Sequence, residues 1–353
     1  MNIWKTTLLL VLLFTGITVH AQKVKISLNS DGNLTIWKVK AQAEIEHPSD
    51  MMTTRYDTRD WVKATVPGTV FGSYVLEGLE PDPNFADNAY KVDKAKYDRN
   101  FWYRTEFNSP EVENGERVWL NFEGVNRKGE IFFNGTRLGL LDGFMHRGNF
   151  DITDLLSKNG KNVLAVQIHR FSDANYLECQ DFWRLSGFER DVYLYAQPQL
   201  RIVDFKVESP LDADYNNGIL KFKIKIANSS KPIYPSYVIS YKLLDKDGQQ
   251  VATSDYAVKA MPAPGISQSL TEFVFDDNII KSPKQWTAET PYLYTLVISL
   301  KKPESGEVME ATSVKVGFRT VEMKNNQLCV NGKPILVKGV NVHEHNEHTG
   351  HYV

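Results

Sequence analysis

Short runs of β-forming residues, separated by turn residues, constrain the fold of this chain more than any other feature. The clearest runs in its first half are Val118–Phe122, Gly129–Phe133, Val163–His169 and Val192–Ala196. Asn134-Gly135 lies between Gly129–Phe133 and the run TRLGLL, and it is typical of a two-residue hairpin turn, because both turn positions need a positive φ. Helical periodicity is scarce. We therefore predict a mainly β fold, with a jelly roll over residues 22–198.

The strand pattern changes near Leu200. Further runs alternate apolar and polar residues between turn-forming segments; they are Arg201–Glu208, Gly218–Asn228, Tyr237–Leu244, Ser267–Phe275 and Tyr292–Lys301. An immunoglobulin-like sandwich has roughly 100 residues and this density of strands. We therefore predict such a β-sandwich for residues 199–316, with no low-complexity linker before it.

The remaining region, residues 317–353, begins as a hairpin and continues as an apolar run. Asn331-Gly332 marks the turn. Ile335–Val342 is mostly apolar without alternation, which is typical of a strand buried on both faces. A (β/α)8 barrel needs about 250 residues. We therefore expect this region to be only the first strand of a truncated barrel.

Composition and the N-terminus limit the function classes. The 353 residues carry a net charge of −2, so the chain lacks the basic face that nucleic-acid binding needs. Lys5, the apolar Leu8–Phe14 and a cleavage site ending at Ala21 predict a secretory signal peptide over residues 1–21. An uncleaved anchor is the alternative, but that run is too short to span a bilayer. We expect an exported protein, in which Cys179 and Cys329 can pair but need not.

Half of the eight histidines lie in the last eleven residues; they are His343, His345, His348 and His351. A helical zinc-protease motif, His-Glu-x-x-His, fails here because Glu347 occupies the second histidine position. A looser metal site that includes His343 and His345 is one alternative, and a solvated loop is another. We interpret the histidines as polar groups at the C-terminal mouth of a barrel strand, where barrel active sites lie.

A second polar cluster occupies residues 176–192, YLECQDFWRLSGFERDV. Asp181 stands close to Trp183 and Arg184, ahead of Ser186-Gly187, which we expect to be flexible. A carboxylate accepts hydrogen bonds from sugar hydroxyls, and an aromatic ring covers apolar C–H faces. The segment therefore predicts a sugar-contacting loop. A buried Asp–Arg pair that only fixes the loop is the alternative.

The motifs QDFWRLSGFERDVYLY, PKQWTAETPYLYTL and NGKPILVKGVNVHEHNEHTGHYV together resemble glycoside hydrolase family 2. The resemblance covers essentially the whole mature chain. It implies a sugar-binding jelly roll, an immunoglobulin-like sandwich and a catalytic barrel, in that order. GVNVHEHN followed by TGH is similar to the β-galactosidases of this family. WVKATVPGTV, GLEPDPN and FWYR are similar to its β-mannosidases and exo-glucosaminidases.

The resemblance implies a sugar site of which this chain holds one part. His343 matches a barrel histidine that contacts the sugar and the transition state. Asp181 matches an acid that reaches the sugar near a hydroxyl or a bound sodium ion. Asn84 and Asn88 lie in a loop that enters the same site, although this loop departs from the galactosidase pattern. Trp183 is expected, with its neighbour Arg184, to shape the loop that carries Asp181.

The resemblance also implies what the chain lacks. The catalytic acid/base and nucleophile would be glutamates beyond residue 353, and the magnesium ligands would lie there too. We predict that neither Glu344 nor Glu347 is a catalytic carboxylate. The chain itself is expected to hold no cofactor.

We therefore expect the N-terminal part of an exported retaining exo-β-glycosidase, β-galactosidase-like, acting on terminal β-linked sugars of oligo- or polysaccharides. One alternative is a β-mannosidase or exo-glucosaminidase of the same family. Another is a non-catalytic carbohydrate-binding protein built on the jelly roll. A carbohydrate is the expected partner, without nucleic acid or a membrane span. The sequence leaves the sugar, the linkage and the oligomeric state open, an oligomer included.

Overall fold

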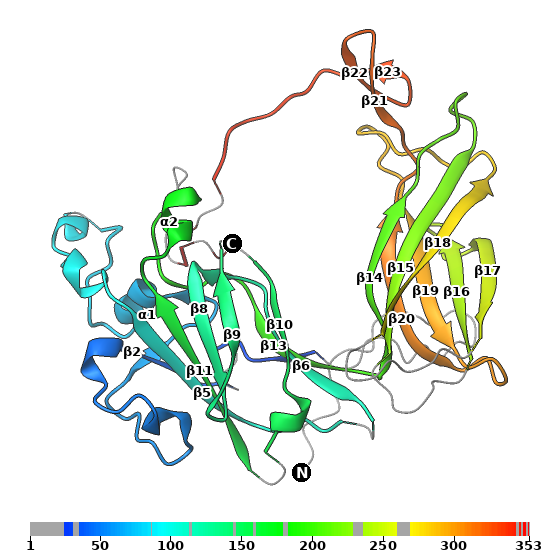
Figure 1. Cartoon of the computed structure of the whole chain (residues 1–353). Helices are drawn as coiled ribbons and strands as arrows, with labels where there is room; N and C mark the ends of the chain where they lie inside the picture. Colours follow the sequence, from blue (N-terminus) through cyan, green and yellow to red (C-terminus); the bar gives the residue numbers. More distant parts are fainter. Residues whose placement is uncertain are drawn as a thin grey trace. The chain divides into compact units, whose positions relative to one another are not determined.

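The computed structural model describes residues 25–30, 35–85, 87–112, 115–143, 146–157, 160–178, 183–228, 236–259, 269–343, 346, 349–350 and 352. The chain divides into two compact units (Figure 1). The first unit contains residues 24–197 and 339–353, and the second contains residues 198–338. Both are built from antiparallel strands, which confirms the predicted mainly β fold.

Two sheets form the body of the first unit. The smaller has the strand order β1 (Ile26–Ser27), β13 (Val192–Gln197), β6 (Arg117–Phe122) and β10 (Gly148–Asp151). The larger has the order β3 (Val62–Ala64), β2 (Trp37–Ala41), β5 (Phe101–Asn108), β11 (Lys161–His169), β8 (Lys128–Phe133) and β9 (Thr136–Asp142). The turn between β8 and β9 is Asn134-Gly135, with φ of 47° and 84°, as its sequence predicted.

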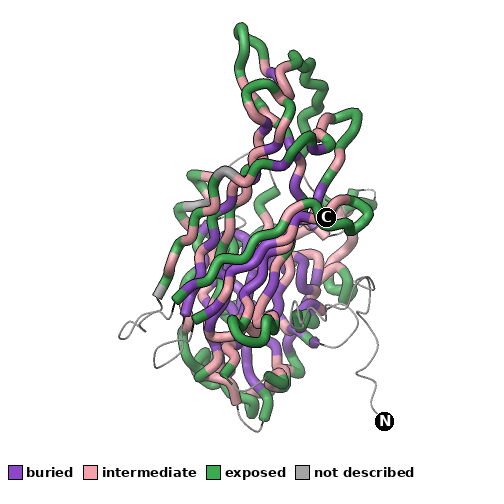
Figure 2. Tube along the Cα trace, turned by 90° about the vertical axis from the view of Figure 1, so that its right-hand side faces the viewer, coloured by how far each residue is buried: buried purple, intermediate pink, exposed green. Residues whose placement is uncertain are grey.

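Alternation along the strands builds the core of this unit. In β6, Val118, Leu120 and Phe122 are buried against the opposite sheet. The Phe188 ring packs edge-on against Tyr103, with ring centroids 4.9 Å apart. Figure 2 shows the buried residues running along the strands. Such burial of apolar area is the main force that holds the sheets together.

Shorter elements complete the first unit. A small sheet has the order β4 (Gly68–Thr69), β12 (Gly187–Phe188) and β7 (Val125–Asn126). The α-helices are α1 (Val70–Leu76) and α2 (Asp173–Leu177). Single 3-10 turns are η2 (Gln42–Glu44), η3 (Asp50–Met52), η4 (Asn88–Tyr90), η5 (Lys94–Lys96) and η6 (Thr153–Leu155). Thr69 caps the start of helix α1: its hydroxyl accepts a hydrogen bond from the Gly72 amide at 2.9 Å.

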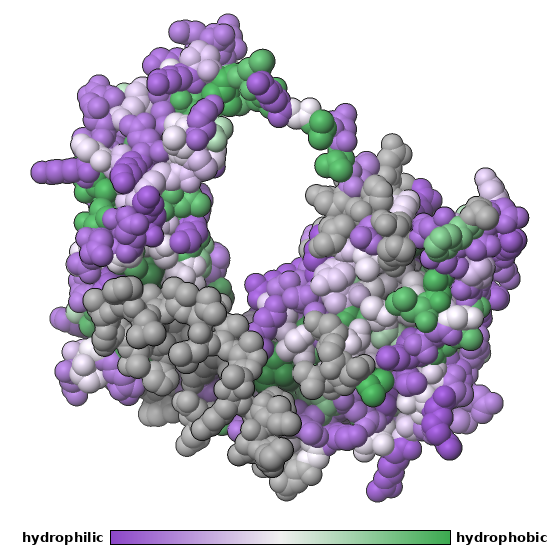
Figure 3. Space-filling model, turned by 180° about the vertical axis from the view of Figure 1, so that it is seen from behind, coloured by the Kyte–Doolittle hydropathy of each residue, from purple (hydrophilic) through white to green (hydrophobic). Residues whose placement is uncertain are grey.

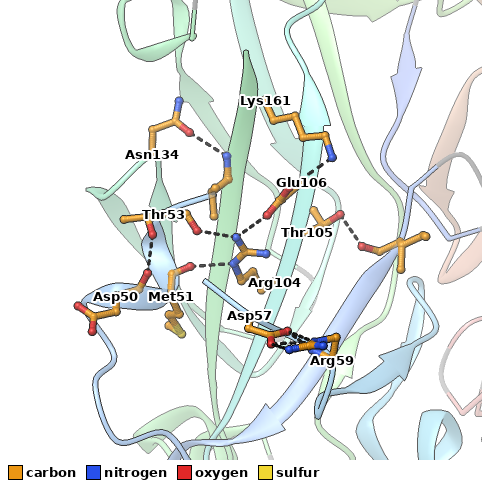
Figure 4. A network of polar contacts seen from close by, with 12 residues as sticks. Asp50, Met51, Thr53, Asp57, Arg59, Arg104, Thr105, Glu106, Asn134 and Lys161 are labelled. Carbon is orange, nitrogen blue, oxygen red and sulfur yellow. Dashed lines mark hydrogen bonds and ion pairs between the residues drawn. The ribbon is translucent and has the colours of Figure 1, made fainter. Parts of the chain in front are cut away.

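An arginine attaches one irregular segment to the sheet. Arg104 of β5 is 3% exposed, and its guanidinium donates to the carbonyls of Met51 and Thr53 at 2.7 and 2.8 Å. It also donates to the Glu106 carboxylate at 2.6 Å (Figure 4). One buried cation thus satisfies backbone carbonyls that lie outside the sheets.

The second unit is a sandwich of two antiparallel sheets. One sheet has the order β14 (Leu200–Glu208), β15 (Gly218–Asn228) and β18 (Ser269–Ile280). The other has the order β17 (Gln250–Val258), β16 (Tyr237–Leu244), β19 (Tyr294–Lys301) and β20 (Val308–Val316). Phe222, Leu296 and Ile298 lie in its own buried core. This arrangement confirms the predicted immunoglobulin-like sandwich.

A third sheet in this unit has the order β21 (Val321–Lys324), β22 (Gln327–Val330) and β23 (Lys333–Pro334). The predicted turn at Asn331-Gly332 is present, with φ of 52° and 73°. The predicted strand over Ile335–Val342 is not: these residues form no strand and are exposed. Figure 3 shows hydrophobic side chains along this extended segment. A barrel strand takes its hydrogen bonds from parallel neighbours, and the described residues provide none.

The N-terminal and cysteine predictions fall largely outside the described residues. Residues 1–24, which include the predicted signal peptide, lie outside the described residues, and so does Cys179. Cys329 is buried with a free thiol. In the part of the chain that the structure describes, none of the helices has both the length and the apolar character needed to cross a lipid bilayer.

Candidate functional site

Asn84 and Asn88 lie in the loop between α1 and β5, and hydrogen bonds within that loop hold them in place. The Asp82 carboxylate accepts hydrogen bonds from the Asn84 backbone and side-chain amides at 2.9 and 3.0 Å. The Asn88 side-chain amide donates to the Asp82 carbonyl at 3.0 Å, and its oxygen accepts from Lys91 at 3.2 Å. Asn84 is exposed and Asn88 is half-buried. Both shape the loop, and their contact with a sugar stays a prediction.

The end of this loop packs on α1. The Tyr97 ring lies edge-on to Phe71 and Tyr74, with ring centroids 5.2 and 5.8 Å away. Glu80 binds the Lys96 ammonium at 2.8 Å. Burial, followed by the influence of the nearby Glu80 carboxylate, raises the pKa of the Tyr97 hydroxyl, which therefore stays neutral. The loop thus has an apolar anchor before it enters β5.

The segment that carries Asp181 is bounded by two arginine contacts. Residues 179–182 lie outside the described part of the chain. Just before them, the Glu178 carbonyl accepts a hydrogen bond from Arg127 Nη1 at 3.0 Å. Just after them, the Arg184 carbonyl accepts one from Arg170 Nη1 at 2.6 Å. The ends of the segment are therefore attached to the body of the jelly roll.

Ser186-Gly187 was predicted to be flexible, but Gly187 belongs to a sheet and Ser186 directly precedes it. The Ser186 carbonyl accepts a hydrogen bond from the Val70 amide at 2.9 Å, and Gly187 is buried in β12. A Cβ on Gly187 would lie 2.3 Å from the Gly68 carbonyl oxygen, so the glycine permits close approach of two strands. The prediction of flexibility was wrong because it rested on composition and ignored this pairing.

The C-terminal segment packs on the same region. Asn346 and Gly350 exchange backbone hydrogen bonds of 2.7 and 2.9 Å, and Gly350 is buried with φ of 76°. A Cβ on Gly350 would lie 2.8 Å from Leu185 Cδ1 and 2.9 Å from Thr69 Cγ2. The segment therefore lies against the start of α1 and the residues that follow the Asp181 segment.

His343 is exposed, and the other predicted polar groups of the tail lie outside the described residues; they are Glu344, His345, Glu347, His348 and His351. Trp183, predicted to shape the Asp181 loop, is 46% exposed. The described residues contain no group of three or more His, Cys, Asp or Glu side chains that could hold a metal. Asp181 and His345 are not among them. The possible sodium ion at Asp181 therefore stays a prediction, and the metal site at His343 and His345 stays an alternative.

Arg170 joins two of these segments. Its Nε donates to Asp98 at 3.1 Å, and its backbone amide donates to the Asn100 side chain at 3.0 Å. Its Nη1 makes the contact with the Arg184 carbonyl. The last residues of the loop that carries Asn84 and Asn88, the residues after the Asp181 segment and the C-terminal segment thus lie next to one another at one end of the jelly roll.

Sequence reasoning missed Arg127 and Arg170. The β11–β8 register pairs His169 with Lys128, which brings the two arginines to the same end of the larger sheet. Their position next to strand ends is visible in the sequence, but this register is not.

Three family domains match the chain in order. Residues 37–182 match the glycosyl hydrolase 2 galactose-binding domain-like family, and residues 200–319 match glycosyl hydrolases family 2. Residues 321–353 match the TIM barrel domain of glycosyl hydrolases family 2. The last match agrees with the predicted start of a barrel.

Similar curated proteins are β-galactosidases. That of Priestia megaterium is 37% identical over 300 residues, which cover 85% of this chain and 27% of the relative. That of Photobacterium profundum is 32% identical over 339 residues, which cover 94% and 31%. The chain thus spans about a third of the length of these relatives.

Solved structures share the fold. A Bacteroides uniformis β-glucuronidase superimposes with a TM-score of 0.76 at 19% identity, covering 94% of this chain and 36% of that one. A putative β-galactosidase from Bacteroides fragilis gives a TM-score of 0.70 at 20% identity, covering 94% and 46%. The three matched domains, in this order and over this fold, identify the chain as a member of glycoside hydrolase family 2.

Proposed function

We propose that this chain is the N-terminal part of an exported retaining exo-β-glycosidase with β-galactosidase-like specificity. The observation that carries the proposal is the meeting of three segments at one end of the jelly roll. These are the loop of Asn84 and Asn88, the residues flanking Asp181, and the start of the barrel region. The names of the similar curated proteins support the choice of a β-galactoside.

The chemistry divides between this chain and residues beyond it. A retaining glycosidase uses two carboxyl groups about 5–5.5 Å apart, one as acid/base and one as nucleophile. We assign both to the longer protein, together with its magnesium ligands. In this chain, the Asp181 carboxylate would accept a hydrogen bond from a sugar hydroxyl and could also bind a sodium ion. His343 would contact the sugar from the barrel side.

Replacement of the proposed sugar contact tests this assignment. In the full-length protein, Asp181→Asn should lower kcat/KM for a nitrophenyl β-galactoside about 10- to 100-fold, because a hydrogen bond to a charged group contributes roughly 1.5–3 kcal/mol. Asp154→Asn is the control, since the Asp154 side chain is 84% exposed and pairs with Arg117. Equal activity of the Asp181→Asn and control proteins would refute the assignment.

The chain by itself should be inactive. Residues 1–353 lack the proposed carboxylate pair, so purified protein should not turn over nitrophenyl β-galactoside above the uncatalysed rate. Clear turnover by the chain alone would overturn the proposal that the catalytic residues lie elsewhere.

A different sugar is the second candidate, favoured by the β-mannosidase-like motifs around Trp61 and Phe101. The full-length protein should hydrolyse nitrophenyl β-galactoside faster than the β-mannoside or the β-glucosaminide. The reverse order would reassign the substrate within the family. Binding of free galactose by the chain alone, measured by calorimetry, would instead favour a carbohydrate-binding module.

A further inference from the structure

We infer that the edge strand β17 is an interaction surface for a second copy of this chain, whose own β17 pairs with it antiparallel. The inference concerns the second unit alone and does not depend on the proposed glycosidase activity. Such a pair would join the sheets of the two copies into one continuous sheet.

Strand β17 has a free side along which another strand can bind. Within the described residues, it is an outer strand of its sheet and pairs with β16 alone (Figure 1). It is exposed along most of its length, and Val258 at its end is buried. A register shift near its start leaves Ala252–Val258 paired to β16 without interruption. An edge of this kind presents backbone N–H and C=O groups to another strand.

The sequence of β17 lacks the features that usually protect a sheet edge. Charged side chains and proline on an edge strand discourage its pairing with another molecule. β17 carries one charged residue, Asp255, and has neither proline nor glycine. The other edge strands of seven or more residues each carry at least two charged residues; they are β9, β14, β18 and β20. A second strand therefore meets the least charge at β17.

The charge of Asp255 is compensated within its own sheet. Lys301 Nζ lies 3.4 Å from the Asp255 carboxylate and donates a 2.7 Å hydrogen bond to Ser240 Oγ. Ser240 is the residue of β16 that pairs with Asp255. An approaching strand would thus meet an edge whose carboxylate already has a counter-ion.

Charge and size select one register for a two-fold pair. With Asp255 at the centre, the two copies of its carboxylate would lie opposite each other, which is unfavourable. With Ser254 at the centre, Asp255 lies opposite Thr253 of the second copy. Tyr256 then lies opposite Ala252, so a ring that is 52% exposed covers a small residue. The members of each pair share a face of the sheet, because strand positions two apart do so.

This contact stops at two chains. Each copy uses the same residues, so the contact is isologous and closes on itself. Pairing of β17 with β20, the opposite edge of the sheet, would instead continue from chain to chain. β20 carries Glu310 and Lys315, which disfavour that arrangement. We therefore expect a dimer.

Sedimentation equilibrium of the 353-residue chain tests the association. The chain should pass from monomer to dimer as its concentration rises. A chain that remains monomeric at about 1 mM would overturn the inference, because no useful affinity would remain. An assembly that keeps growing beyond two chains would overturn it as well, since a β17 pair leaves no second edge of the same kind.

Two substitutions of one exposed residue test the register. Thr253→Asp places a second carboxylate opposite Asp255 and should raise the dimer dissociation constant about tenfold, whereas Thr253→Lys should lower it about threefold. Both variants lose the hydrogen bond from Thr253 Oγ1 to the Tyr241 carbonyl, so their difference reports the charge. Ser313→Asp, at an exposed position of β20, is the matched control and should leave the constant unchanged. Equal constants for the two Thr253 variants would overturn the inference.

Hydrogen exchange locates the contact. The amides of β17 that do not donate to β16 should exchange slowly at high protein concentration and faster on dilution to the monomer. A dimer in which β17 exchanges at the monomer's rate would overturn the inference. Slow exchange of all these amides at every concentration would overturn it too, because residues of the same chain would then cover this edge.

Discussion

His169 is a half-buried histidine whose surroundings disfavour its charged form. Burial, and then the nearby Lys128, lowers its pKa, while Glu130 and Asp142 act in the opposite direction. Its Nε2 is buried without a hydrogen-bond partner among the described residues. The folded protein therefore favours the neutral form of the His169 imidazole over its charged form.

The first unit should consequently lose stability in weak acid. The unfolded chain takes up the His169 proton near about pH 6.5 and the folded chain only below that, so the contribution is fully present above about pH 6.5 and falls as the pH drops. Between about pH 7.5 and 5.5, the melting temperature of His169→Gln should fall less than that of the wild type. His47→Gln serves as the control for the loss of a histidine, because His47 is exposed. Parallel curves for wild type and His169→Gln would contradict this expectation.

At the residue scale, the sequence predicted the backbone conformation of two Asn-Gly pairs best. Asn134-Gly135 and Asn331-Gly332 both form the predicted turns, because few other residues tolerate this backbone conformation. The resemblance to the family supplied the candidate sugar-site residues, which are Asp181, His343, Asn84 and Asn88. The two arginines that border the Asp181 segment carry no local pattern, since their partners are backbone carbonyls far along the chain.

Among the elements, some strands were predicted from their sequence and others were missed. Val118–Phe122 and Tyr237–Leu244 correspond to β6 and β16, which are paired on both sides. β17 and β20 were not predicted. They are the two edges of one sheet; β17 is mostly exposed, and β20 is mostly half-buried. The segment Ile335–Val342 shows the opposite error, because apolar composition alone does not make a strand without neighbours.

The C-terminal segment depends on one glycine. Gly350→Ala should detach it, because φ of 76° costs a side chain roughly 1–2 kcal/mol and the new methyl would meet Leu185 and Thr69 at 2.8 and 2.9 Å. Peptides from the last residues should exchange hydrogen faster in this variant. Gly306→Ala is the matched control, since Gly306 has φ of 68° and open space around it. Unchanged exchange in Gly350→Ala would mean that the contact does not hold the segment.

At the scale of the whole molecule, each of the two units has a main hydrophobic core of its own. Leu120 is fully buried in the first core, and Leu296 is fully buried in the second. The order of the domains could be predicted from sequence because strand length, turn spacing and motif order all change near Leu200. The site could be predicted only in part, because the proposal assigns its remaining groups to a barrel, and this chain matches the barrel domain over residues 321–353 alone.

Two cores should give two thermal transitions. Leu296→Ala should lower one of them by roughly 10 °C, because a buried leucine truncated to alanine costs about 2–5 kcal/mol. Leu120→Ala should lower the other. Differential scanning calorimetry of the chain measures both. If each substitution moved both transitions together, the cores would unfold as one cooperative body.

The two Asn-Gly turns have a consequence for the chemical ageing of the protein. Asparagine followed by glycine is prone to deamidation when the next backbone nitrogen can reach the side-chain carbonyl. Here the Asn134 amide donates to the Leu155 carbonyl at 2.8 Å, and the Asn331 amide donates to the Trp286 carbonyl at 3.2 Å. Both turns must open before the reaction proceeds. Since one of these two turns lies in each unit, deamidation of Asn134 and of Asn331, followed by peptide mapping of a stored sample, would record how often each turn opens.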